Sequence, residues 1–136
     1  MKVNFEIEEN YAVQFQGRHL DLHNNFELVE IRDLEKEIEI EFRKSEGNWV
    51  PKDELNELIF TFKGISYKYE EEGESEPYPE DWKILGELSF FPSNMRDIND
   101  GFIPQSLPKK EDDILFIFEN GRLIRINCDE VELKIK

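Results

Sequence analysis

The chain has 136 residues and a formal net charge of −15 at pH 7, and 38% of its residues are hydrophobic. Its length suits one domain over residues 1–136, and its eleven Phe, four Tyr and two Trp indicate a folded core despite the high charge. The charge argues against nucleic acid and anionic membrane partners, because both are bound through Lys and Arg. It favours a basic protein partner, or simply high solubility.

The remaining bulk features favour a cytoplasmic protein. The N-terminal segment has no apolar stretch typical of a signal peptide, and no run approaches the length of a transmembrane span. Cys128 is the only cysteine, so no internal disulfide is expected, which fits a reducing compartment. The sequence leaves the oligomeric state open.

Alternating apolar residues predict several short strands in the first part of the chain. Gly17 and the Asn24-Asn25 pair predict turns between them. The apolar parity shifts between Leu28 and Val29, which indicates a β-bulge or burial on both faces. The strands are expected over residues 3–7, 11–15, 20–22, 26–32 and 37–43.

Three short helical segments are expected further along. Residues 53–57 suit one helical turn. Residues 80–86 begin with acids and end at Gly86, as the helix dipole and the preference for glycine after a helix favour. Residues 93–100 have Ser93 as a candidate N-cap and are followed by Gly101. A strand over residues 88–91 separates the last two.

The chain is organised around residues 59–81, a core strand followed by the most acidic segment. Phe60 and Phe62 share one parity, whereas Ile65, Tyr67 and Tyr69 share the other, and Gly64 lies at the change. Glycine at such a point favours a β-bulge that would bring all five side chains onto one face. The alternative is a strand buried on both faces.

The C-terminal third predicts three strands. Residues 114–118 are apolar on both faces, as in a central strand. Asn120-Gly121 is a strong two-residue hairpin signal, after which residues 123–128 return antiparallel, with Cys128 on the apolar face. Residues 131–135 form the last strand. We therefore expect an all-β or β-rich fold, an antiparallel sandwich or partly closed barrel of about eight or nine strands.

No residue set predicts a reaction, and we expect no enzyme, cofactor or metal site. His19, Asp21 and His23 would share one strand face, but the Cα atoms of the two histidines would lie about 13 Å apart, so a polar solvent face is favoured over a zinc or iron site. Cys128 is expected to be a buried, inert thiol. Asp97 to Gly101 departs from the EF-hand order, and calcium binding by the acidic run is a weaker alternative.

The acidic run between β-rich segments is the candidate functional site. From Glu70 to Asp81 seven residues are acidic and none is basic. A solvated surface would explain the charge alone. Aromatic residues expected in loops near or beyond the run favour a protein-binding surface, because aromatic rings supply affinity and charges supply association rate and orientation. The predicted partner-binding residues are Glu70, Glu71, Glu72, Glu74, Glu76, Tyr78, Glu80, Asp81, Trp82 and Trp49.

With residues 70–82, its small acidic chain and its lone Cys128, the sequence resembles the immunity proteins of bacterial toxin–immunity systems. The resemblance implies a cytoplasmic inhibitor that binds a basic, nuclease-like toxin and blocks its active site. It implies no fold, because the class includes many. Two alternatives remain: a β-barrel or sandwich that binds an apolar small molecule, and a self-associating structural protein.

Overall fold

The computed structural model describes all of residues 1–136 as an open β-sandwich. Twelve strands form three sheets, with 49% of the residues in strands and 6% in two short 3-10 helices. The predicted all-β class is confirmed, and the sheets do not close into a barrel. The predicted strand number was too low, mainly because two expected strands each divide between two sheets.

The first large sheet has the order β1-β12-β7-β6-β5. Its pairs are antiparallel except for β1 with β12. The register of β5 against β6 shifts between Leu28 and Glu30, so the irregularity predicted near Val29 is a β-bulge. The strands are β1 (Lys2–Val3), β12 (Glu130–Ile135), β7 (Glu57–Lys63), β6 (Glu37–Lys44) and β5 (Phe26–Asp33).

The second large sheet has the order β8-β11-β10-β9 and is antiparallel throughout. A hairpin at Asn120-Gly121 joins β10 to β11 as predicted, but its loop has three residues, 119–121, and not two, because Phe118 N donates to Arg122 O and Gly121 N donates to Phe118 O. Gly121 has a φ of 88°. β10 is a central strand, which confirms the expectation from its two apolar faces. The strands are β8 (Tyr67–Glu71), β11 (Leu123–Asn127), β10 (Asp112–Phe118) and β9 (Leu85–Pro92).

Phenylalanine rings fill the space between the two large sheets. Phe116 of β10 packs edge-on against Phe60 and Phe62 of β7, with ring centroids 5.6 and 5.9 Å apart. Burying one such side chain stabilises the fold by about 1.5–3 kcal/mol, and each aromatic pair adds about 0.5–1.5 kcal/mol. The period-two apolar pattern of the sequence therefore produces the sandwich directly.

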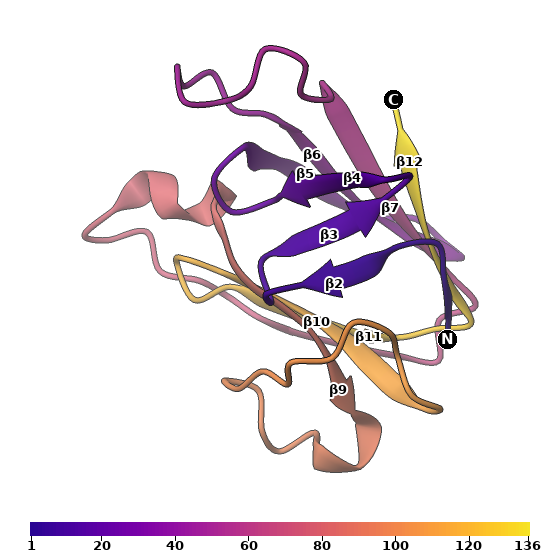
Figure 1. The fold of residues 1–136 in the computed structure, drawn as a ribbon. Helices are drawn as coiled ribbons and strands as arrows, with labels where there is room; N and C mark the ends of the chain where they lie inside the picture. Colours follow the sequence, from indigo (N-terminus) through magenta and orange to yellow (C-terminus); the bar gives the residue numbers. More distant parts are fainter.

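A third sheet covers one open side of the sandwich (Figure 1). It has the order β2-β3-β4, and Gly17, at a φ of 78°, turns β3 into β4. Phe5 precedes this sheet and contacts Phe60 and Phe90, one from each large sheet. The predicted strand 3–7 therefore divides between β1 and β2. The strands are β2 (Glu6–Glu8), β3 (Ala12–Phe15) and β4 (Arg18–Asp21).

The predicted strand through residues 59–69 is wrong in both of its forms. The chain leaves the first sheet at the end of β7 and enters the second sheet as β8, so Tyr67 and Tyr69 do not share a face with Phe60. Gly64 makes the change of direction at a φ of 68°, and a side chain there would collide with the carboxylate of Asp129. Asp129 belongs to the second crossing between the sheets, from β11 to β12.

The predicted helices are also corrected. Residues 53–57 form no helix. The helix expected over residues 80–86 is the 3-10 helix η1 (Pro79–Lys83), and Gly86 lies in β9. The helix expected from Ser93 to residue 100 is only η2 (Ser93–Met95), and no side chain caps it. Hydrogen bonds to the sheet explain both differences, because Glu119 N donates to Ile84 O and Arg125 Nη1 donates to Ile98 O.

A covering segment, residues 93–111, crosses the outer face of the second sheet (Figure 1). The backbone N–H of Ile103 donates to Ser89 Oγ of β9 at 3.0 Å, and the side chain of Asn10 donates to Ile103 O at 3.1 Å. The segment therefore hides part of this face and leaves the rest open. None of the helices in the structure has the length and apolar character needed to cross a membrane.

Candidate functional site

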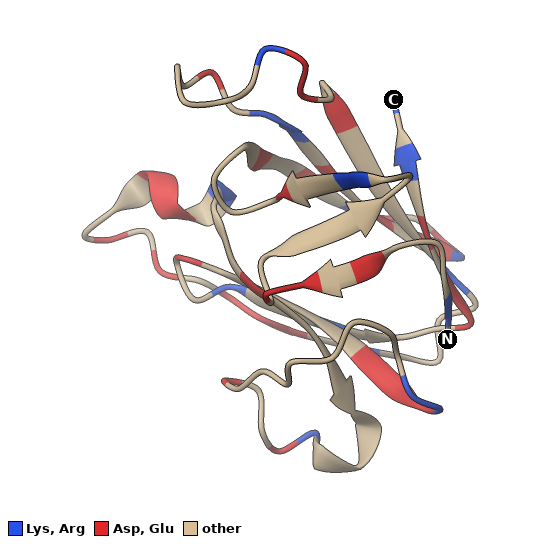
Figure 2. Ribbon diagram, viewed as in Figure 1, with Lys and Arg blue, Asp and Glu red and all other residues tan.

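The acidic loop, residues 70–81, runs from the end of β8 into η1 (Figures 1 and 2). Glu74 N donates to Asn120 O at 2.8 Å, which fixes the middle of the loop beside the β10–β11 turn. Gly73 permits this contact, because a side chain there would collide with the amide of Asn120. The loop is therefore held at a defined place, next to a further acid, Glu119.

Most of the negative charge in the acidic loop has no counter-charge. Glu80 pairs with Lys83 at 2.9 Å, and Glu70 lies 3.7 Å from Lys68. The other five acids form no ion pair within 4 Å. They are Glu71, Glu72, Glu74, Glu76 and Asp81.

The acids on the outer face of the first sheet are arranged differently. Arg32 contacts Glu30, Glu39 and Glu41 at 2.6–2.9 Å. Lys63 and Lys134 both lie 3.3 Å from Glu132. The acids around Arg32, Lys63 and Lys134 are therefore ion-paired, whereas five acids of the acidic loop are not.

The predicted aromatic residues are exposed, two of them in or beside the acidic loop. Tyr78 is 68% exposed and Trp82 41% exposed, so the alternative that Trp82 belongs to a helix core is wrong. Tyr78 lines a hollow of about 170 Å³ with Glu74, Glu76, Asp81 and residues of the hairpin turn. Trp49 is 64% exposed but lies in a separate loop, where its Nε1 donates to Asn24 O at 2.7 Å.

A larger hollow, here called the acidic groove, lies on the uncovered part of the outer face of the second sheet. It has a volume of about 380 Å³. Four carboxylates line it, each from a different element, together with the apolar side chains of Ile117 and Leu123. These carboxylates are Glu71 of β8, Glu87 of β9, Asp100 of the covering segment and Glu119 of the β10–β11 turn.

The sequence analysis placed only Glu71 of these residues in the site. Glu87, Asp100 and Glu119 are far apart in the sequence. The register of β9 with β10 and the hydrogen bonds of the covering segment bring them together. The one local signal is parity: Glu87 alternates with Ser89 and Phe91, which places it on the outer face of β9. This alternation assigns Glu87 to one face of the sheet but does not predict that a groove lies there.

The electrostatics of the acidic groove are unfavourable to its own carboxylates. No Lys or Arg lines it. Burial raises the pKa of Glu87, and the nearby charge of Glu119 raises it further. Arg122 lines the neighbouring hollow with Glu70, Glu71 and Glu72 but forms no ion pair within 4 Å. No Lys or Arg balances the negative potential of the groove, and the His23 ring lies beside it, with its Nδ1 3.6 Å from Glu119 Oε1.

A buried ion-pair network supports one wall of the acidic groove. Arg125 Nε lies 2.7 Å from Asp113 Oδ2, and both side chains are fully buried. Arg96 completes the pair from the covering segment at 2.9 Å and stacks on the ring of Tyr67 at 3.6 Å. Arg125 also donates to Asn99 Oδ1 at 2.9 Å. This network holds Asn99, and with it Asp100, against the sheet.

Asp113 is ionised at neutral pH because of this network. Burial alone would raise its pKa, but hydrogen bonds from Arg96, Asn127 and Arg125 outweigh that effect and lower the pKa below its usual value. Sequence analysis did not identify this network. Arg125 in the otherwise apolar pattern of β11 was its one available signal.

The two histidines do not share a partner. His19 contacts Glu8 at 3.0 Å on the exposed face of β4. His23 lies beyond the strand, where its Nδ1 is 2.6 Å from Leu85 O and 3.6 Å from Glu119 of the acidic groove. Asp21 accepts hydrogen bonds from Asn24. Cys128 is 5% exposed, and burial raises the pKa of its thiol to about 11, so the predicted buried thiol is confirmed.

The chain matches no family model, and no curated protein or solved structure is significantly similar to it.

Proposed function

We propose that this chain is a non-enzymatic binding module that recognises a basic protein, as an immunity protein recognises a nuclease-like toxin. The observation that carries the proposal is the separation of paired and unpaired acids. Five acids of the acidic loop and the carboxylates of the acidic groove have no Lys or Arg partner, whereas those around Arg32, Lys63 and Lys134 do.

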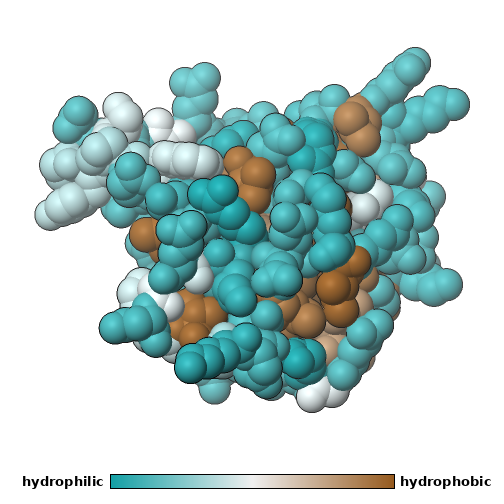
Figure 3. All heavy atoms as spheres, turned by 90° about the horizontal axis from the view of Figure 1, so that it is seen from above, coloured by the Kyte–Doolittle hydropathy of each residue, from teal (hydrophilic) through white to brown (hydrophobic).

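The exposed aromatic residues support recognition of a protein. Tyr78 and Trp82 project from a segment whose charges would steer a basic partner toward it, and aromatic rings at the centre of an interface carry much of the binding energy. The face seen from above in Figure 3 is hydrophilic over most of its area, with hydrophobic residues in small separate spots. Such a face suits a partner that binds through charges and a few isolated side chains better than a partner that needs a broad apolar interface.

The test is a reconstitution with a partner encoded beside this chain. The candidate is a secreted protein with a basic C-terminal domain in a flanking reading frame. We expect the purified basic domain to form a stoichiometric complex with this chain and to lose its nuclease activity in that complex. A basic domain that remains active and free at micromolar concentrations of this chain would contradict the proposal.

A further inference from the structure

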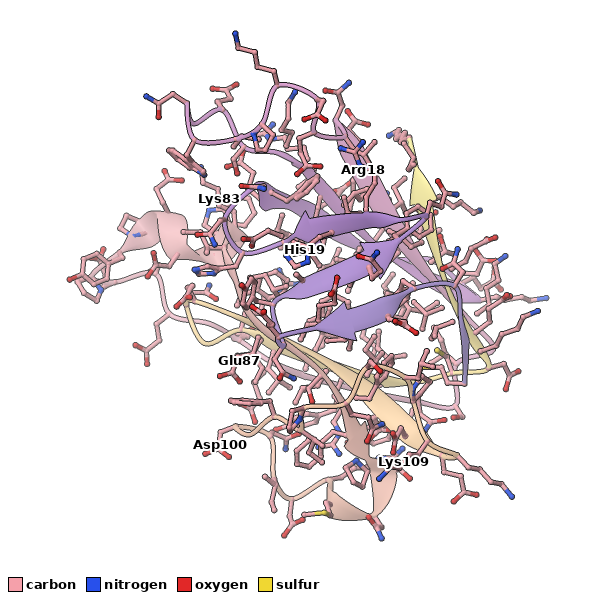
Figure 4. The ribbon with its side chains drawn as sticks, viewed as in Figure 1. Arg18, His19, Lys83, Glu87, Asp100 and Lys109 are labelled. Atoms are coloured by element: carbon pink, nitrogen blue, oxygen red, sulfur yellow. The ribbon has the colours of Figure 1, made fainter.

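The acidic groove is a sheet face that the protein itself leaves open. The covering segment lies over Leu115 and Arg125, which are 1% and 0% exposed. Asn99 and Asp100 of this segment line the edge of the hollow, and Ile117 lines it from the sheet. The result is a hollow with apolar side chains on its sheet side and carboxylates around it. Two of these carboxylates, Glu87 and Asp100, are labelled in Figure 4.

Two features of the acidic groove describe the group that fits it. The carboxylates approach from four elements, so they surround the space instead of occupying one point. Ile117 and Leu123 offer an apolar surface to the same space. A complementary group therefore has an apolar stem and a cationic end with several hydrogen-bond donors.

We propose that the acidic groove binds an arginine side chain of the basic partner, an inference that rests on the proposed function. Arginine fits better than lysine because its planar guanidinium directs five N–H donors toward separate carboxylates and stacks on apolar or π surfaces. Its methylene stem would cover Ile117 and Leu123. The guanidinium would relieve the repulsion between Glu87 and Glu119, the repulsion that contributes to the raised pKa of Glu87.

Other occupants fit the acidic groove less well. A metal ion needs several oxygen ligands at about 2.0–2.6 Å, whereas no group of three or more His, Cys, Asp or Glu residues is placed to hold one. A second copy of this chain would bring another net charge of −15 to an acidic surface, which opposes association. Charge complementarity therefore favours a cationic side chain from another protein.

The probe for this proposal is N-acetyl-arginine amide, titrated into the ¹⁵N-labelled protein and followed by NMR. We expect saturable shifts at the backbone amides of Gly86, Ile117, Gly121 and Leu123. N-acetyl-citrulline amide, which has nearly the same shape and no charge, should produce no saturable shift. N-acetyl-lysine amide should bind about tenfold more weakly than the arginine probe.

Two double variants with the same change in net charge provide the matched comparison. Glu87→Gln with Glu119→Gln should weaken binding of the arginine probe by about tenfold or more, because it removes two of the four carboxylates. Glu35→Gln with Glu46→Gln, two exposed acids outside the groove that form no ion pair, should leave binding within about twofold.

Several outcomes would overturn the proposal. These are no shift in the groove, equal binding of the arginine and lysine probes, equal loss in both double variants, or a concentration-dependent dimer whose interface covers Ile117. The result is separate from the proposed function. If the basic domain binds and is inhibited while the arginine probe does not bind, only the arginine assignment fails; if the probe binds and no basic domain does, only the proposed partner class fails.

Discussion

The residues that matter most to the fold beyond its apolar core are the two buried charges of β10 and β11. Asp113 and Arg125 are fully buried and 2.7 Å apart. A buried pair of this kind is not itself strong evidence of net stabilisation, because desolvation opposes the attraction. Removing one member is costly, however, because the other stays buried without its counter-charge.

We expect Asp113→Asn to lower the free energy of unfolding by about 3 kcal/mol at pH 7. The measurement is urea unfolding at a series of pH values, with Asp53→Asn, an exposed acid, as a control that changes stability by less than about 0.5 kcal/mol. Because the folded pKa of Asp113 is lowered, its ionised form stabilises the fold above the unfolded pKa of about 4, and this contribution is lost as pH falls through the folded value.

The variant should therefore lack that part of the acid-induced loss of stability. A destabilisation below about 1 kcal/mol at pH 7 would show that Arg96 and the peptide carbonyls around Arg125 suffice without the Asp113 charge. If Asp113→Asn releases only the covering segment and leaves the sandwich folded, the NMR signals of the backbone amides of residues 96–103 should still shift.

The element that presents the aromatic anchors is η1, together with the acidic loop that precedes it. None of the residues of η1 is buried. Its position depends on Lys83, which contacts Glu80 within the helix and Glu27 of β5 at 3.6 Å. Trp82 thus stands on a short segment tied to the sandwich, in a place where its ring is available to a partner.

We expect Trp82→Ala to speed dissociation from the basic domain by about 30-fold, which corresponds to about 2 kcal/mol. Its melting temperature should change little, since the side chain is 41% exposed. Leu34→Ala is the matched control, because Leu34 is 43% exposed in the β5–β6 turn. An unchanged dissociation rate, or a melting temperature lowered by as much as that of a core variant, would remove Trp82 from the interface.

The elements that the sequence predicted correctly have local signals. Asn120-Gly121 located the β10–β11 hairpin because glycine readily takes the positive φ that the end of the loop needs, although the loop is one residue longer than predicted. The shift after Leu28 marked the bulge in β5. The same signal misled at Gly64. A parity shift is identical whether a strand bulges or the chain moves to another sheet, and only the close approach of Asp129 distinguishes the two.

The acidic groove shows more clearly what the sequence alone does not predict. The acidic loop could be predicted, because its charges follow one another in the sequence. The groove could not, because Glu87, Asp100 and Glu119 come together through the register of β9 with β10 and through the hydrogen bonds of the covering segment. No spacing in the sequence encodes such non-local contacts.

Over the whole molecule, the acidic surface produces a long-range electrostatic field. An uncompensated patch raises the rate of encounter with a basic partner by about one to three orders of magnitude at low salt. Near physiological ionic strength the field extends only about 8 Å. Association should therefore depend steeply on salt, whereas dissociation, set by short-range contacts, should depend on it less.

The most direct measurement is the association rate constant of the basic domain with the Glu71→Gln, Glu72→Gln, Glu74→Gln, Glu76→Gln variant, followed across ionic strength. The account predicts slower association at low salt, a flatter salt dependence and a nearly unchanged dissociation rate. The charge-matched control, Glu6→Gln, Glu35→Gln, Glu46→Gln, Asp53→Asn, should retain most of the wild-type salt dependence. If the loop variant associates at the wild-type rate at every salt concentration, the acidic loop is only a solvated surface and the account is contradicted.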